Sequence, residues 1–180
     1  MLPKYKYLLT YRYAEVIYDL TAAFCQRFLT GRDNLRLREQ MISAARSNKQ
    51  NIVEGVSQQA SLKGQIKLLG VAQASTEELL ADYEDFLRHR RLKIWPKTDN
   101  RIGKYRQWGI EATKSYPPKT PRLLKLLREL REEEVGNLML TLCHQLSYLL
   151  TKQIKATEKK FVEKGGYSEN LFRKRLRSRR

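Results

Sequence analysis

The chain has 180 residues, and its 36 Lys and Arg against 19 Asp and Glu give a formal net charge of +17. A hydrophobic fraction of 41%, with ten Tyr and two Trp, excludes a disordered chain and suffices for the core of one ordinary domain. No run of about 18 apolar residues is present, which argues against a membrane-spanning helix, and neither a signal sequence nor a disulfide framework is apparent. These features predict a cytoplasmic globular protein.

The first two predicted helices carry apolar side chains at helical spacing. The first covers about residues 8–29 and the second about residues 35–56, each with an apolar stripe that repeats every three or four positions. Gly31 ends the first helix, and Asp33 or Asn34 can cap the second.

A third helix is predicted over about residues 62–90, with Ser61 as its N-cap. Its stripe continues to the end of the segment, although Gly64 and Gly70 interrupt the first half. Each glycine lowers helix propensity by about 1 kcal/mol relative to alanine. We therefore expect these glycines to permit the close approach of a neighbouring helix.

A long connector follows, over about residues 91–131, and a bare loop of this length inside a domain is unusual. It is better interpreted as two short helices. The first spans residues 99–113 and is capped by Asp99. The second begins with Thr120 as a cap and Pro121 at the first helical position.

The fourth long helix is predicted over about residues 132–164, and its apolar face is wider than a lone bundle helix requires. Such a face would be covered by the helix's own bundle on one side and by another subunit on the other. Together the four long helices predict an all-α fold, an antiparallel four-helix bundle over residues 1–164 with the basic helical connector inserted between helices three and four.

Residues 165–180 form a basic C-terminal extension after a Gly-Gly helix stop. Within this extension, Ser168 can cap a short helix. Tyr167 and Phe172 are spaced for a hydrophobic staple around that cap.

The positive charge is segregated along the chain. Residues 1–87 hold 11 basic and 10 acidic residues, whereas residues 88–131 hold 14 and 3. Residues 132–150 hold three acidic and no basic residues, and residues 151–180 hold 11 basic and 3 acidic ones. A surface that only keeps the protein dissolved would mix the two signs, so this segregation favours a polyanionic partner such as nucleic acid.

Two motifs lie on the second and third helices: QMISAARSNKQNIVEG over residues 40–55 and LGVAQASTEEL over residues 69–79. Together they resemble the four-helix-bundle family that includes the rRNA intervening-sequence proteins and the accessory variability determinant (Avd) of diversity-generating retroelements. The segment FVEKGGYSENLFRKRL, residues 161–176, is similar to the C-terminal extension of one branch of that family.

The resemblance implies a basic homo-oligomer, which is a homopentamer in Avd-type members. It further implies a protein that binds template RNA and a reverse transcriptase without being catalytic itself. The enlarged connector and the tail depart from the minimal pattern of the family and leave the partner open. RNA, DNA and an RNA–cDNA hybrid are not distinguished, because phosphate contacts carry no sequence information.

Cations in four places are the predicted nucleic-acid contacts: the end of the third helix, the connector, the polar side of the fourth helix and the tail. At the helix end a structural role beside the helix dipole is an equal alternative. In the connector, Tyr105 and Trp108 are either core anchors or, if exposed, a stacking surface for an unpaired base. The predicted contacts are Arg88, Arg90, Arg91, Lys93, Arg101, Lys104, Arg106, Lys152, Lys155, Lys159, Arg173, Lys174, Arg175 and Arg177.

Polar residues within the two motifs predict a structural network between helices or subunits rather than a pair of catalytic carboxylates. Their spacing places them on shared helix faces beside the apolar stripes. A buried carboxylate must be paired, so we expect Arg46 to pair with Glu78 or Glu54. The predicted network comprises Arg46, Ser47, Asn51, Glu54, Ser75 and Glu78.

The sequence predicts neither an enzyme nor a cofactor or metal site. His89 and His144 stand alone, and Cys143 points to a different helix face from His144, whereas a zinc site needs several ligands at workable spacing. No phosphate-binding glycine loop or nucleophile motif is present. The alternative function is a homo-oligomeric interaction or scaffold protein of the same fold, with an acidic protein partner and no nucleic-acid role.

Overall fold

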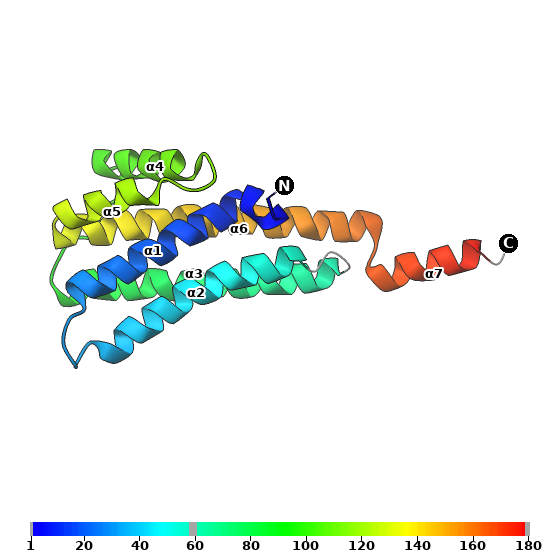
Figure 1. Ribbon diagram of the computed structural model, residues 1–180, viewed down its shortest axis with the longest axis horizontal. Coiled ribbons are helices and arrows are strands. Elements are labelled where there is room, and N and C mark those ends of the chain that lie inside the picture. Colours follow the sequence, from blue (N-terminus) through cyan, green and yellow to red (C-terminus); the bar gives the residue numbers. More distant parts are fainter. Residues whose placement is uncertain (1, 58–60, 179–180) are drawn as a thin grey trace.

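The computed structural model describes residues 2–57 and 61–178, which form helices and no strand. Four long helices lie side by side and alternate in direction along the molecule (Figure 1). Each contacts two of the others: α1 and α3 both pack on α2 and on α6. The four are α1 (Leu9–Phe28), α2 (Leu35–Ser57), α3 (Leu62–His89) and α6 (Glu132–Lys164).

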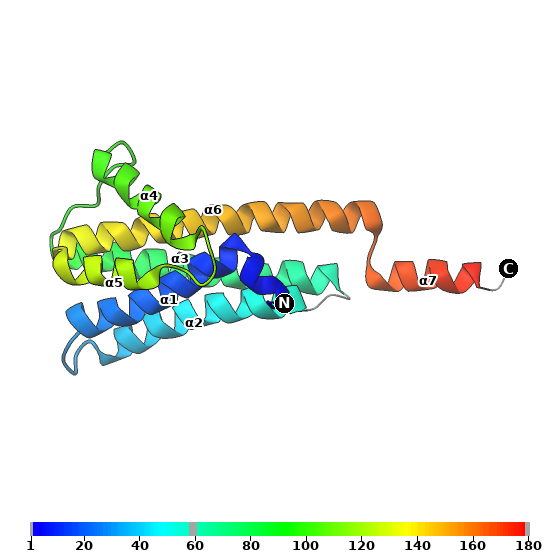
Figure 2. The same cartoon turned by 45° about the horizontal axis from the view of Figure 1, so that its top comes forward.

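The shorter helices pack on these four long helices or extend beyond them. The 3-10 helix η1 (Lys4–Tyr7) packs on α1 and α2, whereas α4 (Asn100–Thr113) and α5 (Thr120–Glu129) pack on the α1–α6 side. Helix α7 (Tyr167–Arg177) extends beyond the far end of α6 in both ribbon views (Figures 1 and 2). None of the helices among the described residues is long and apolar enough to cross a bilayer.

An aromatic cluster between α1 and α3 forms one end of the core. Phe24 packs edge-on against Tyr83 and Phe86, with ring centroids 4.9 and 4.7 Å apart. The buried Tyr83 hydroxyl lies 2.8 Å from the hydroxyl of Thr21, so its polar atom is satisfied inside the core. Most residues of the apolar stripes predicted for the long helices are buried, and the others are mostly partly buried.

Two predicted helix caps are confirmed. The Ser61 hydroxyl accepts a hydrogen bond from the amide of Gly64 at 3.1 Å, and the Asp99 carboxylate accepts one from the amide of Arg101 at 2.9 Å. Each cap satisfies an amide at a helix start that has no partner within the helix. The bounds predicted for the long helices agree with the structure to within about one residue at most ends.

Two other predicted caps are wrong. Helix α5 already includes Thr120, and Lys119 occupies the N-cap position. Helix α7 begins at Tyr167, before Ser168, and Glu169 instead accepts a hydrogen bond from the amide of Gly166 at 3.1 Å. With the start shifted, Tyr167 no longer precedes the cap, and the expected staple to Phe172 does not form because both rings are largely exposed.

The wide apolar face of α6 is covered differently from the prediction. Its first half is buried almost all round because α4 and the connector pack on it in addition to α1 and α3. Trp95 and Ile102 are among the buried residues that come from these segments. The prediction for Gly70 is also wrong within the protomer, since a Cβ atom built there would meet nothing within 4 Å.

Candidate nucleic-acid interface

Two of the predicted cations at the end of α3 are held by the protein itself. Arg88 forms an exposed ion pair with Asp85 at 2.7 Å. Arg90 donates a hydrogen bond to the carbonyl of Phe28 at 2.9 Å, lies over the ring of Phe86 and stands 3.5 Å from Glu132. Arg90 therefore ties α3 to the end of α1 and to the start of α6.

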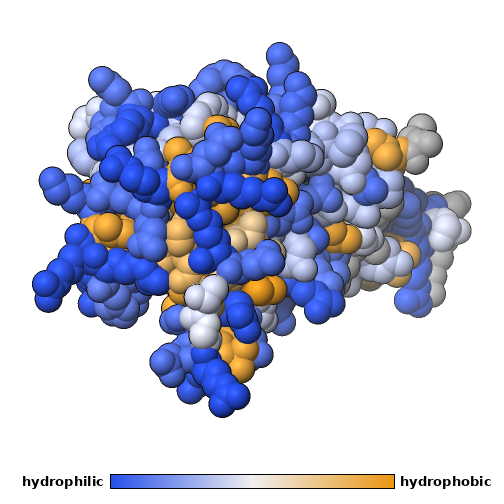
Figure 3. All heavy atoms as spheres, turned by 60° about the vertical axis from the view of Figure 1, so that its left-hand side comes forward, coloured by the Kyte–Doolittle hydropathy of each residue, from blue (hydrophilic) through white to orange (hydrophobic). Residues whose placement is uncertain are grey.

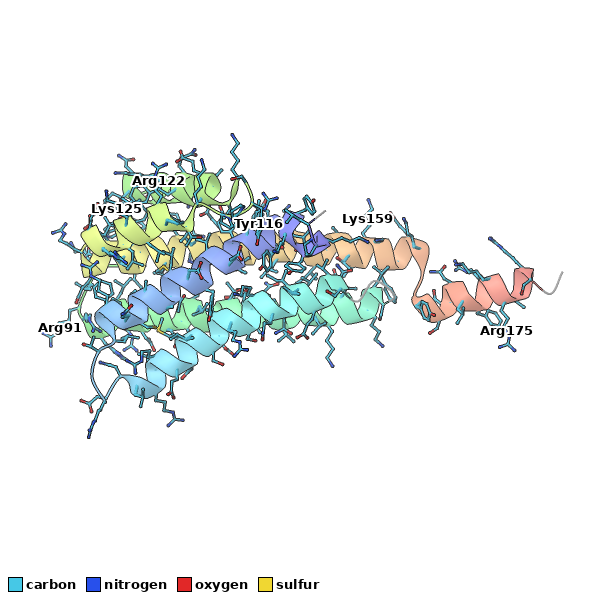
Figure 4. The ribbon with its side chains drawn as sticks, viewed as in Figure 1. Arg91, Tyr116, Arg122, Lys125, Lys159 and Arg175 are labelled. Atoms are coloured by element: carbon cyan, nitrogen blue, oxygen red, sulfur yellow. The ribbon has the colours of Figure 1, made fainter. Side chains whose placement is uncertain are left out.

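The next two cations are exposed and have no ion-pair partner among the described residues. Arg91 adopts a left-handed backbone conformation with φ of 56° and projects from the end of the molecule (Figure 4). Lys93 follows it with an exposed side chain, while its main chain is tied down on both sides: its amide donates to Glu133 and its carbonyl accepts from Asn137.

From Lys93 the connector continues as a segment outside the helices, residues 93–97, which we name the strap, before α4 begins. The amide of Trp95 donates to Asn137 Oδ1 at 2.8 Å, and its indole nitrogen donates to Glu133 Oε1 at 2.7 Å. The indole hydrogen bond is the main reason why the pKa of Glu133 is lowered. One face of the strap is thereby fixed to the first turns of α6.

Arg101 is a structural residue rather than a free cation. Its guanidinium lies 3.4 Å from the centre of the Trp95 ring and forms an ion pair with Asp99 at 2.8 Å, which lowers the pKa of Asp99 to about 2. Tyr105 is buried against Trp95, which confirms its interpretation as a core anchor, and Trp108 is half-buried. Tyr105 therefore offers no free stacking face, whereas Trp108 is only partly covered.

The other two cations of α4 remain exposed. Lys104 lies 5.0 Å from the centre of the Trp108 ring. Arg106 has no ion-pair partner among the described residues, and its carbonyl accepts a hydrogen bond from Gln145 of α6 at 3.2 Å. Figure 3 shows the end of the molecule that lies on the left in Figure 1, where α6 begins. Hydrophilic side chains cover most of this end, and apolar patches lie between them.

A pocket of about 590 Å³ opens between the strap, α4 and α6. Sequence reasoning did not find it, because its walls come from three segments that are far apart in the chain. The apolar lining consists of Ile94, Trp95, Pro96, Ile102, Leu140 and Tyr148. The polar lining consists of Lys97, Arg106, Asn137, Thr141, His144 and Gln145.

The predicted cations of α6 continue from this pocket along one side of the helix. Tyr148, Lys152, Lys155 and Lys159 are spaced by four, three and four residues, so they share a face, which we name the α6 stripe. Lys152 lies 5.5 Å from the centre of the Tyr148 ring. Lys159 pairs with Glu163 at 3.8 Å and projects from the edge of α6 on which α4 lies (Figure 4).

The predicted cations of α7 are all exposed. No ion pair engages them among the described residues, and in Figure 4 Arg175 lies far from the other labelled residues. The helix also exposes the apolar side chains of Leu171 and Phe172. The predicted contacts are therefore strung along the long axis rather than gathered in one patch. Those on α7 are Arg173, Lys174, Arg175 and Arg177.

The polar network of the two motifs is only partly present. Ser75 donates to the Ser47 hydroxyl at 3.0 Å, and Asn51 donates to the same hydroxyl at 3.2 Å. The three charged members, Arg46, Glu54 and Glu78, are exposed, and no ion pair joins them in the described part of the chain. The expectation of buried carboxylates paired with Arg46 is wrong within the protomer, because these side chains point outward from α2 and α3.

Two structural polar residues were missed by sequence reasoning. Asn48 is buried on the α2 stripe and donates to the Ala72 carbonyl at 2.7 Å and to the Thr76 hydroxyl at 2.5 Å. Its place four residues before the buried Ile52 was a usable signal. Arg12 donates to four carbonyl oxygens at the ends of η1 and α4, and no sequence pattern pointed to this contact.

Within residues 2–57 and 61–178 no cluster of three or more His, Cys, Asp or Glu side chains could hold a metal ion. Comparison of the chain with models of protein families, with characterised proteins and with solved structures finds no match.

Proposed function

We propose that the protein is a non-catalytic nucleic-acid-binding subunit of the Avd-like kind that its two motifs resemble, which binds template RNA and docks a reverse transcriptase. The observation that carries this proposal is a set of exposed cations without an ion-pair partner among the described residues. Such uncompensated charge attracts a polyanion. The set comprises Arg91, Lys93, Lys104, Arg106, Lys152, Lys155, Arg173, Lys174, Arg175 and Arg177.

As part of the same proposal, α1, α2, α3 and α6 form the antiparallel four-helix bundle of that family, and the protomers assemble into a homopentamer. A shallow groove between α2 and α3 supports the assembly. It is lined by small side chains such as Ser43 and Ala74 and exposes the apolar Val71. Small residues let a second protomer approach closely, and assembly would multiply the net charge of +17 fivefold.

The test is binding of a fluorescent single-stranded RNA to the purified protein over a range of salt concentrations. The logarithm of the affinity should fall linearly with the logarithm of the salt concentration, with a slope of about −0.7 for each phosphate contacted. Replacing Lys104 and Arg106 with Gln should weaken binding and flatten this slope. Binding that does not respond to salt contradicts the proposal.

A second measurement separates the two candidate functions. The alternative function is a scaffold or interaction protein with an acidic protein partner and no nucleic-acid role. It would be supported if the protein binds no RNA but captures a reverse transcriptase in a complex that survives nuclease treatment. A complex whose assembly depends on the RNA supports the proposal.

A further inference from the structure

We propose that the pocket between the strap, α4 and α6 takes an unpaired nucleobase from single-stranded nucleic acid, while the neighbouring phosphates lie along the α6 stripe. This inference rests on the proposed function and names the part of the surface that recognises the strand. The pocket volume of about 590 Å³ lies within the range of about 300–1,000 Å³ that is usual for ligand sites.

The walls of the pocket are fixed before any ligand arrives. Asn137 accepts from the amide of Trp95 at 2.8 Å and donates to the carbonyl of Lys93 at 2.8 Å, which anchors the strap to α6. On the other side, Gln145 donates to the carbonyl of Arg106 at 3.2 Å and so joins α4 to α6. Binding of a ligand therefore requires little ordering of the protein around the pocket.

The lining suits a flat aromatic ligand that is attached to negative charge. Ile94 and Tyr148 are 52% and 62% exposed, although both are large apolar side chains beside a pocket. A base stacked on the Tyr148 ring would cover this surface. Lys97 and Arg106 also line the pocket and have no ion pair among the described residues, so they are placed to meet phosphate oxygens.

The α6 stripe supplies the continuation of the strand. From Tyr148 to Lys159 the helix rises about 16 Å at about 1.5 Å per residue, with two further cations, Lys152 and Lys155, on the same side. A backbone that leaves the pocket in this direction meets a cation at each turn of α6. The stripe thus provides salt-dependent affinity, whereas the pocket requires a base that is free to leave its stack.

The buried polar groups of the pocket predict weak sequence preference. The Asn137 side chain already bonds to Trp95, Lys93 and the carbonyl of Glu133, and the Thr141 hydroxyl donates to the Asn137 carbonyl. Neither of these two buried groups has a free donor with which to read the edge of a base. Recognition by stacking tolerates any base, because every base has a π-face.

The test compares Tyr148→Ala and Tyr148→Phe in the full chain, using a fluorescent single-stranded 20-mer RNA and the same strand with abasic sites. Loss of one stacked base corresponds to about a five- to hundredfold weaker affinity, so Tyr148→Ala should weaken binding of the normal strand by that factor. Tyr148→Phe keeps the ring and should bind like the wild type. Tyr7→Ala, which removes another exposed tyrosine that does not line the pocket, is the matched control and should also bind normally.

Three results decide the inference. It is supported if Tyr148→Ala loses affinity for the normal strand and the wild type binds the abasic strand as weakly as this variant does. It fails if Tyr148→Ala and the abasic strand both bind normally while wild-type binding stays salt-dependent, and in that case the proposed function stands. If the wild type binds no single strand at low salt, the proposed function itself fails.

Discussion

Asn137 determines the position of the strap with a single amide group. Its side chain is buried and forms three hydrogen bonds, to the amide of Trp95 and to the carbonyls of Lys93 and Glu133. Asn137→Ala leaves the buried Trp95 amide without a partner, so we expect the free energy of unfolding to fall by about 2–3 kcal/mol. Urea unfolding followed by circular dichroism measures this change. The exposed Gln107→Ala is the control and should lie within about 0.5 kcal/mol of the wild type.

The charged form of Asp82 is disfavoured by its surroundings on α3. Burial, reinforced by Glu78 and Asp85, raises its pKa to about 6, and its Oδ2 atom is buried without a hydrogen bond. The folded protein therefore keeps a proton that the unfolded chain releases near pH 4, and this group costs stability progressively as the pH rises from about 4 through 6.

Replacement of Asp82 with Asn removes that loss of stability. We expect Asp82→Asn to gain about 1 kcal/mol over the wild type at pH 7 and little at pH 4, since solvent screens part of the effect. Urea unfolding at the two pH values gives the comparison. The exposed Glu84→Gln is the matched control on the same helix and should show the same difference from the wild type at both. A gain for Asp82→Asn that is equal at both pH values would contradict this account.

At the scale of elements, helix α4 contains two glycines with opposite surroundings. A Cβ atom on Gly109 would lie 2.6 Å from Gln145 Oε1 and 2.8 Å from Leu142 Cδ2, because α4 approaches α6 closely there. A Cβ atom on Gly103 would meet nothing within 4 Å. The close packing of α4 on α6 thus favours glycine at position 109, whereas Gly103 only lowers the helix propensity of α4.

Alanine at these two positions should have opposite effects. We expect Gly103→Ala to raise the free energy of unfolding by up to about 1 kcal/mol through helix propensity. Gly109→Ala should lower it by about 1–2 kcal/mol, since overpacking against α6 outweighs the same gain. Thermal unfolding of the two variants beside the wild type checks the signs. Equal stabilisation by both would show that α4 does not pack closely on α6.

Helix α7 should contribute to the binding of nucleic acid but little to the stability of the fold. It makes no extensive contact with another helix among the described residues, and its side chains are almost all exposed. Deletion of residues 165–180 should therefore leave the melting temperature within about 2 °C of the full chain. Its loss of cations should weaken binding of single-stranded RNA and lower the salt slope. A deleted chain that binds RNA as tightly as the full chain would remove α7 from the interface.

At the scale of the whole molecule, the outward faces of α2 and α3 carry the charged motif residues Arg46, Glu54 and Glu78. The groove between them is lined by Gln40, Ser47 and Ser75, and Glu78 stands at its edge. Among the described residues, no other helix covers this polar, small-residue face of two neighbouring helices. Contact with a second copy of the chain would account for it.

A large charged side chain in this groove should block assembly without unfolding the protomer. Ala74 is exposed and lines the groove, so Ala74→Arg should fold normally and reduce the mass in light scattering from that of a pentamer to that of a monomer. Val162→Arg makes the same kind of change at an exposed position on α6 and should leave the mass unaltered. A pentamer that persists with Ala74→Arg places the interface elsewhere.

The sequence by itself determined the helices and most of their ends, because periodicity and caps such as Ser61 and Asp99 depend on residues within a few positions of each other. It also located the excess charge. Only the tertiary structure decided which cations are free: Arg90 and Arg101 are engaged by groups that include Phe28 and Trp95. It likewise decided that the protomer's own connector covers α6 and that a pocket forms there. These outcomes depend on packing between segments that are distant in sequence, and local patterns carry no information about such contacts.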